Sequence, residues 1–239
     1  MLAPPRAAAP QRVSTAALVG AALLALLYPS NASAEDADIV VTEPDDDDSS
    51  TDYAILVGTF TADLSGSDFG LYGLAGGLAG DVEAGVAALG LTYDPGLAAF
   101  GGNAFLRAGY IGIYNESTTL RPDPQDDRAR FELHWSRAFG EVTVQHRSRL
   151  EHRFRDVSDQ TRYRPRLRAL LDTDGALTPF VSAELFYAFQ DDDVQLLLGE
   201  AGVSLRLNDR WSLSGSYLTN VAFADSATNI GLVALSTRF

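Results

Sequence analysis

Apolar and polar residues alternate along most of the chain after Tyr53, in segments of about ten residues separated by short stretches of turn-forming residues. This alternation predicts β-strands, because successive side chains of a strand point to opposite faces of a sheet. No long segment in this part of the chain has the spacing of an amphipathic helix. The clearest strands are expected at residues 129–138, 142–155, 162–171, 179–189, 195–207, 211–221 and 229–239.

Three of the expected strands carry charge on one face. Between residues 162 and 168, four arginines recur at every second position and therefore share a face. If the loop 156–160 closes the preceding hairpin, Arg153 lies opposite Arg164, and Glu151 lies opposite Arg166. The expected charged cluster comprises Arg147, Arg149, Glu151, Arg153, Arg162, Arg164, Arg166, Arg168 and Glu184.

Alternation fits two architectures, because a soluble antiparallel sandwich also has one apolar and one polar face. In a transmembrane barrel, by contrast, the apolar face meets lipid and the polar face lines the lumen. The chain ends on Phe239 after alternating apolar residues, which matches the signal that outer-membrane proteins present to the barrel assembly machinery. We therefore expect an all-β fold over residues 53–239, an antiparallel transmembrane up-and-down β-barrel of about 10 to 12 strands.

The strand number is harder to derive from the first half of the barrel. Segments 53–63, 69–79, 82–93 and 103–114 are rich in Gly and Ala and alternate poorly. Counting all of them gives eleven strands, whereas bacterial barrels have even numbers. We therefore expect ten or twelve strands, with 53–63 as a piece of chain inside the lumen or part of an extra hairpin.

The connections between strands alternate in length. The tight ones are 139–141, 172–176 and 208–210. The longer, polar ones are 115–127, 156–160 and 222–228. Because outer-membrane barrels have short periplasmic turns and longer extracellular loops, this alternation places Phe239 and the tight turns on the periplasmic side.

The first 34 residues have the order of a secretory signal peptide. Two arginines, Arg6 and Arg12, precede the apolar stretch 16–27, and the small residues 32–34 follow. Twelve apolar residues are too few to span a bilayer, so we expect cleavage after Ala34 rather than a membrane anchor. Export of a barrel by this route predicts the outer membrane of a Gram-negative bacterium, with lipid and lipopolysaccharide as its surroundings.

Charge is distributed unevenly over the chain. The net charge is -14, which argues against nucleic acid as a partner. Residues 35–52 carry nine acids and no base, and we expect a flexible periplasmic tail there. All eighteen basic residues are arginines, and eleven of them lie between Arg128 and Arg168. There is no cysteine, and the three histidines lack carboxylates grouped as in a zinc site, so we expect no metal and no cofactor.

The second half of the chain resembles a known family. The runs RSRLEHRFR (147–155), RYRPRLRALL (162–171), FVSAELFY (180–187) and the terminal ALSTRF (234–239) are similar to those of a domain-of-unknown-function family of small outer-membrane barrels. The resemblance covers the chain from about Phe69. It implies a barrel and supplies neither an activity nor catalytic residues.

A local resemblance concerns the acidic tail. The segment Asp38, Ile39, Val40, Val41, Thr42 is similar to the TonB box of TonB-dependent receptors, which adds as a β-strand to the C-terminal domain of TonB. Those receptors also have a plug domain and a barrel of about 22 strands, for which this chain has no room. Two interpretations stay open, contact with TonB and a merely solvated tail.

The charged cluster suggests two functions that are compatible with each other. Arginines and carboxylates fill and neutralise the lumen of a narrow barrel, and an excess of guanidinium groups attracts anions. A third interpretation is an enzyme, because His146 and Ser148 resemble the His-x-Ser pair of lipid A deacylases. The rest of that pattern is absent, and Glu151 falls on the opposite face. We therefore expect no enzyme, and a transport or channel role for a small, anionic solute; a structural protein without substrate is the alternative.

Overall fold

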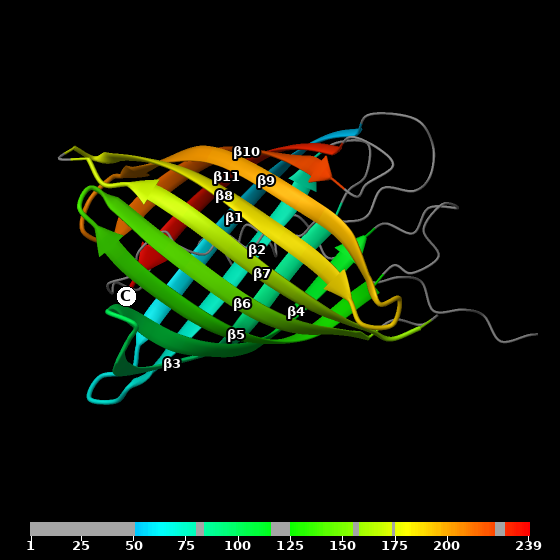
Figure 1. Ribbon diagram of the computed structural model, residues 1–239, viewed down its shortest axis with the longest axis horizontal. Coiled ribbons are helices and arrows are strands. Elements are labelled where there is room, and N and C mark those ends of the chain that lie inside the picture. Colours follow the sequence, from blue (N-terminus) through cyan, green and yellow to red (C-terminus); the bar gives the residue numbers. More distant parts are fainter. Residues whose placement is uncertain (1–50, 80–83, 116–124, 155–157, 174, 223–227) are drawn as a thin grey trace, which may run out of the picture.

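The computed structural model describes residues 51–79, 84–115, 125–154, 158–173, 175–222 and 228–239. They form one closed barrel of eleven strands (Figure 1). The strands are β1 (Thr51–Asp63), β2 (Phe69–Ala79), β3 (Ala84–Ala99), β4 (Gly102–Asn115), β5 (Gln125–Phe139), β6 (Val142–Phe154), β7 (Gln160–Leu171), β8 (Leu177–Ala188), β9 (Asp193–Arg206), β10 (Trp211–Ala222) and β11 (Thr228–Arg238). The all-β barrel predicted from the alternation is confirmed.

The barrel closes between its first and last strands, which run parallel. β1 pairs with β11 from Thr51 opposite Thr228 to Thr61 opposite Arg238, whereas all other neighbouring strands are antiparallel. The amide of Phe239 donates to the carbonyl of Thr61 at 2.8 Å, so the last residue belongs to this seam. An odd number of strands can close because a parallel pair also satisfies the backbone groups of both edges.

The expectation of an even strand number is therefore wrong, and the segment 53–63 is a strand of the wall rather than a piece of chain in the lumen. One consequence concerns the two ends of the barrel. We call the end that holds Phe239 the C-terminal rim and the other end, where β1 begins at Thr51, the N-terminal rim. Because β1 and β11 are parallel, the chain enters the wall at the N-terminal rim and leaves it at the C-terminal rim.

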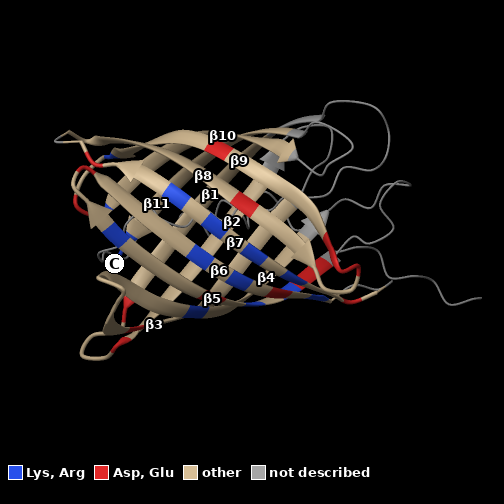
Figure 2. Cartoon of the chain, in the orientation of Figure 1, with Lys and Arg blue, Asp and Glu red and all other residues tan. Residues whose placement is uncertain are grey.

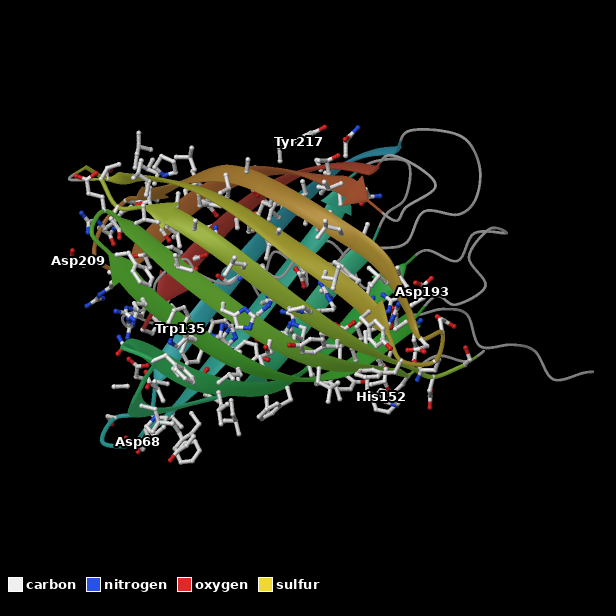
Figure 3. The ribbon with its side chains drawn as sticks, viewed as in Figure 1. Asp68, Trp135, His152, Asp193, Asp209 and Tyr217 are labelled. Atoms are coloured by element: carbon white, nitrogen blue, oxygen red, sulfur yellow. The ribbon has the colours of Figure 1, made fainter. Side chains whose placement is uncertain are left out.

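The connections follow the predicted alternation. The turns expected at 139–141, 172–176 and 208–210 all lie at the C-terminal rim. The connections expected at 115–127, 156–160 and 222–228 join strands at the N-terminal rim, and parts of them lie outside the described residues. Figure 3 shows Asp68 and Asp209 at the C-terminal rim and Asp193 at the N-terminal rim.

The outer face of the wall is apolar. Large hydrophobic side chains point outward from every strand, with exposed fractions such as 66% for Leu56, 57% for Leu167 and 61% for Val221. A soluble sandwich would bury this face, whereas a transmembrane barrel presents it to lipid. The fold is thus compatible with an outer-membrane barrel. No helix in the described ranges is long and apolar enough to cross a membrane.

The inner face has an apolar and a charged part. Ile55 and Val57 of β1, Leu198 of β9 and Leu232 of β11 belong to a buried apolar cluster. Arginines and carboxylates line the inner face of β5 to β8, on the other side of the barrel (Figure 2). The candidate site is this charged part of the lumen wall.

Candidate functional site

The charged residues form five rows across the strands β5, β6 and β7, because residues opposite one another in the register face the lumen together. Numbered from the N-terminal rim, the rows are Arg128, Arg153, Gln160; Arg130, Glu151, Arg162; Glu132, Arg149, Arg164; His134, Arg147, Arg166; and Ser136, Gln145, Arg168. On β8, Glu184 extends the fourth row and Ser182 the fifth. All nine residues of the cluster predicted from the sequence are brought together on this wall, and each is buried.

The predicted register within the hairpin of β6 and β7 is wrong. Arg153 lies opposite Gln160 rather than Arg164, and Glu151 lies opposite Arg162 rather than Arg166. The difference arises because pairing resumes already at Gln160, where β7 begins, so the connection is shorter than assumed. A shift by an even number of residues leaves every side chain on its predicted face, since side chains alternate with a period of two.

Each buried carboxylate contacts more than one cation. Glu151 accepts hydrogen bonds from Arg128 and Arg164, both at 3.2 Å. Glu184 accepts one from Arg147 at 2.8 Å and one from Arg164 at 3.0 Å. These contacts connect β5, β6, β7 and β8 through their side chains as well as their backbones.

Two further acids complete the network. Glu132 accepts a hydrogen bond from Arg149 at 2.6 Å, and its second oxygen lies 2.7 Å from Nε2 of His134. Near the N-terminal rim, Asp126 pairs with Arg128 at 2.6 Å and also with Arg153. Charged groups so deeply buried are tolerated only when they are paired and hydrogen-bonded, because removing an ion from water is costly.

Positive charge exceeds negative charge on the inner face of β4 to β8. Among the described residues, ten arginines and four carboxylates are buried, and none of these arginines exposes more than 7% of its surface. A fifth carboxylate, Glu200, is half-buried beside them and accepts a hydrogen bond from Ser182 at 2.8 Å. Arginine does not lose its proton in proteins, so the excess cannot be removed by titration. The low exposure also means that these side chains do not line a water-filled path in the state described.

Aromatic rings cover part of this charge. Arg107 lies 4.3 Å from the ring centre of Tyr72, Arg164 lies 4.1 Å from that of Phe186, and Arg168 lies 3.6 Å from that of Phe180. A guanidinium over a ring face is stabilised by the ring quadrupole, by up to about 2 kcal/mol when desolvated. These contacts offset part of the repulsion between neighbouring arginines.

Tyr72 reaches the arginines across two glycines. Its hydroxyl accepts a hydrogen bond from Nε of Arg130 at 3.1 Å. A Cβ atom on Gly109 would lie 2.1 Å from this hydroxyl, and one on Gly90 would lie 2.4 Å from the ring. The glycines of β3 and β4 therefore give the ring its place against the wall, which explains why these strands alternate poorly in sequence.

Several members of the site are missing from the predicted cluster. Arg130, Glu132 and His134 lie on the polar face predicted for β5, and the same alternation could have added them. Asp126 fell within a segment interpreted as a loop. Arg107 is the only arginine of β4, where no second charge marks the face that points inward.

The structure contains a small cavity between the fourth and fifth rows. Its volume is about 20 Å³, and it is lined by Phe105, His134, Trp135, Ser136, Gln145, His146, Arg147 and Arg166. The ring of His134 stacks on Phe105 with a centroid distance of 4.4 Å. No carboxylate lines this cavity, although Glu132 and Glu184 each contact one of its lining residues.

The other predicted residues lie elsewhere. His146 and Ser148 are on the outer face, where Nε2 of His146 lies 3.0 Å from the hydroxyl of Ser148, which is in turn 3.0 Å from that of Tyr163. Glu151 is on the inner face, so it does not orient His146. The segment 38–42 lies outside the described residues, as do the expected signal peptide and most of the expected acidic tail. The described ranges hold no group of three or more His, Cys, Asp or Glu side chains that could bind a metal ion.

One of three comparisons with known proteins agrees with the resemblance to a domain-of-unknown-function family. Neither a curated protein nor a solved structure matches the chain. A family model described as a protein of unknown function, DUF2490, matches residues 83–230. This match extends from the residue before β3 into β11 and so contains all the buried arginines of β4 to β7. The chain belongs to the DUF2490 family.

Proposed function

We propose that this protein is an outer-membrane β-barrel that transports small anionic solutes and that its lumen, closed in the state described, opens to let them pass. The observation that carries the proposal is the excess of ten buried arginines over four buried carboxylates among the described residues of the inner face of β4 to β8. Guanidinium groups that are fixed and partly stripped of water attract carboxylates and phosphates and repel cations. An anion that enters the lumen lowers the electrostatic cost of this wall.

Several features support the membrane location. The outward-facing side chains are apolar on every strand, the short turns gather at one rim, and the chain begins with the features of a signal peptide. We place the C-terminal rim in the periplasm, with Phe239 as the residue that the barrel assembly machinery recognises. Lipid and lipopolysaccharide then surround the outer face.

A structural barrel without substrate is the second candidate, and the ion-pair network favours it. Each of the four buried carboxylates bridges strands, so the charges also hold the wall together. The two functions differ in what the surplus arginines do. In a purely structural barrel the surplus has no role in selecting ions, and its removal leaves ion flow unaltered.

Ion flow across planar lipid bilayers separates the two candidates. The variant Arg164→Ser/Arg166→Ser removes two lumen charges, and Arg137→Ser, an exposed arginine of β5, serves as the control. We expect the double variant to lose selectivity for anions and the control to keep it. Absent current from the wild-type protein, or equal selectivity in all three proteins, contradicts the transport proposal.

The direction of β1 argues against contact between the N-terminal tail and TonB. β1 begins at the rim opposite Phe239, so with Phe239 in the periplasm the chain enters the wall from the outside. The N-terminal rim, where β1 begins, then faces away from the periplasmic side on which a TonB box is bound. Deleting 38–42 and measuring the pull-down of the TonB C-terminal domain tests this: a pull-down that the deletion abolishes shows that the contact exists.

We further propose that the protein is not an enzyme. His146 and Ser148 lie at hydrogen-bonding distance. Within the described ranges no carboxylate is seen to orient the imidazole, as nucleophilic catalysis by a His and Ser pair needs. The mass of lipid A in cells that express the wild-type protein should equal that in cells that express His146→Ala. A difference in mass between the two would show hydrolysis.

A further inference from the structure

The fourth row brings like charges face to face. Arg147 lies directly opposite Arg166 on β7. Like charges at opposite positions of neighbouring strands repel each other. The carboxylate that serves this row is Glu184, and one of its oxygens accepts hydrogen bonds from both Arg147 and Arg164. Glu184 thus lies beside two arginines of its own row, Arg147 and Arg166, and also binds Arg164 of the third row.

The cavity described above opens beside this pair of arginines. A volume of about 20 Å³ exceeds the 10 to 15 Å³ that a single water needs. Its lumen-side lining consists of groups that can donate hydrogen bonds, namely the guanidiniums of Arg147 and Arg166, the amide of Gln145 and the hydroxyl of Ser136. Both arginines are buried, with exposed fractions of 3% and 6%.

We propose that this cavity binds one carboxylate-sized anion between Arg147 and Arg166. The inference rests on the proposed function, since it names the place in the lumen where a transported anion is held. Two planar guanidiniums can bind the two oxygens of a carboxylate, while Gln145 and Ser136 donate to the oxygens from the fifth row. The ring of His134, held by Phe105 and Glu132, closes the cavity on the side of β5.

The carboxylate has two sources. One is a free solute, for which formate is the smallest probe. The other is the chain itself, because residues 35–48 carry eight acids and no base and are separated from β1 by two residues. The chemistry of the site is the same in both cases, and the experiment distinguishes them.

The experiment measures the thermal unfolding midpoint of the full-length mature protein as formate is titrated, against equal concentrations of a bulky organic sulfonate. A ligand that binds only the folded state raises the midpoint in a saturable manner. We expect a saturable rise for the wild-type protein and for the exposed control Arg137→Gln. In Arg166→Gln, the formate concentration that gives half of the maximal rise in the unfolding midpoint should increase at least tenfold.

A second variant keeps the test possible if Arg166→Gln does not fold. Ser136→Val fills part of the cavity and leaves every charge in place, and it should weaken formate binding as well. If both variants respond as the wild type does, formate binds elsewhere and the proposal is overturned.

A third variant identifies the source of the bound carboxylate. In it, the eight acids at residues 35–48 are changed to the corresponding amides. If formate raises the unfolding midpoint of this variant but not that of the wild type, the chain's own carboxylates occupy the site. Absence of a response in both proteins overturns the proposal. The readout is independent of the bilayer current, because a barrel that does not conduct can still bind formate, and a conducting barrel can lack this site.

Discussion

Replacing Glu151 with glutamine removes one negative charge from the middle of the arginine-rich wall and preserves the size of the side chain. The carboxylate of Glu151 accepts hydrogen bonds from Arg128 and Arg164, and in the register it lies opposite Arg130 and Arg162. The amide can accept with its oxygen, but its NH2 group then faces a guanidinium that also donates. The substitution therefore removes a negative charge that offsets the positive charges of four surrounding arginines.

The expected loss is large for a single substitution. Removing one partner of a buried ion pair costs about 3 to 5 kcal/mol, because the remaining charge stays desolvated. For a chain of this size, 1 kcal/mol shifts the unfolding midpoint by about 2 to 4 °C, so Glu151→Gln should lower it by roughly 6 to 20 °C. The exposed Glu141 in the turn after β5 provides the matched control, and Glu141→Gln should change the free energy of unfolding by less than about 0.5 kcal/mol.

The assay is thermal unfolding followed by circular dichroism, with all proteins in the same detergent. A second substitution, Arg164→Met, in the Glu151→Gln background should recover part of the loss, because the number of unbalanced charges falls. If Glu151→Gln and Glu141→Gln unfold at the same temperature, Glu151 does not balance the arginines and the charge argument is refuted.

Two further predictions concern packing and closure. Gly109→Ala should destabilise the barrel by about 1 to 3 kcal/mol, because the added Cβ atom would lie 2.1 Å from the hydroxyl of Tyr72. Gly215→Ala is the control: a Cβ atom added there would have no neighbouring atom within 4 Å, so the same unfolding assay should show no change in stability. The pair Leu56→Cys/Val233→Cys should form a disulfide under mild oxidation, because these residues are partners in the parallel seam of β1 and β11 and the chain has no other cysteine. Equal stability of the two alanine variants, or a persistently reduced cysteine pair in the folded protein, contradicts the respective prediction.

The face of each charged residue could be predicted from the sequence because it depends only on parity. Arg162 to Arg168 alternate with apolar residues, so a strand must place all four arginines on one side. The register could not be predicted in the same way, because it depends on where pairing resumes after a loop, and the pairing of Gln160 with Arg153 is set by the whole sheet. The alternation cannot reveal a register shift by an even number of residues, because such a shift moves no side chain to the other face.

The first half of the barrel was harder to predict because its contacts join distant parts of the chain. Tyr72 and Arg130 are 58 positions apart, and the glycines that make room for the ring remove the alternation by which a strand is recognised. The prediction of the strand number was wrong for a different reason. It relied on the rule that barrels closed by antiparallel strands have an even number of strands. The parallel pairing of Thr51–Asp63 with the last strand lies outside that rule.

The central claim is that the arginine-rich wall makes this barrel selective for anions. The most direct test is the reversal potential of the wild-type protein in a planar bilayer between solutions that differ tenfold in KCl concentration. We predict a reversal potential with the sign of chloride selectivity, approaching about 59 mV in magnitude for ideal selectivity. A reversal potential near zero, or one with the sign of potassium selectivity, contradicts the claim.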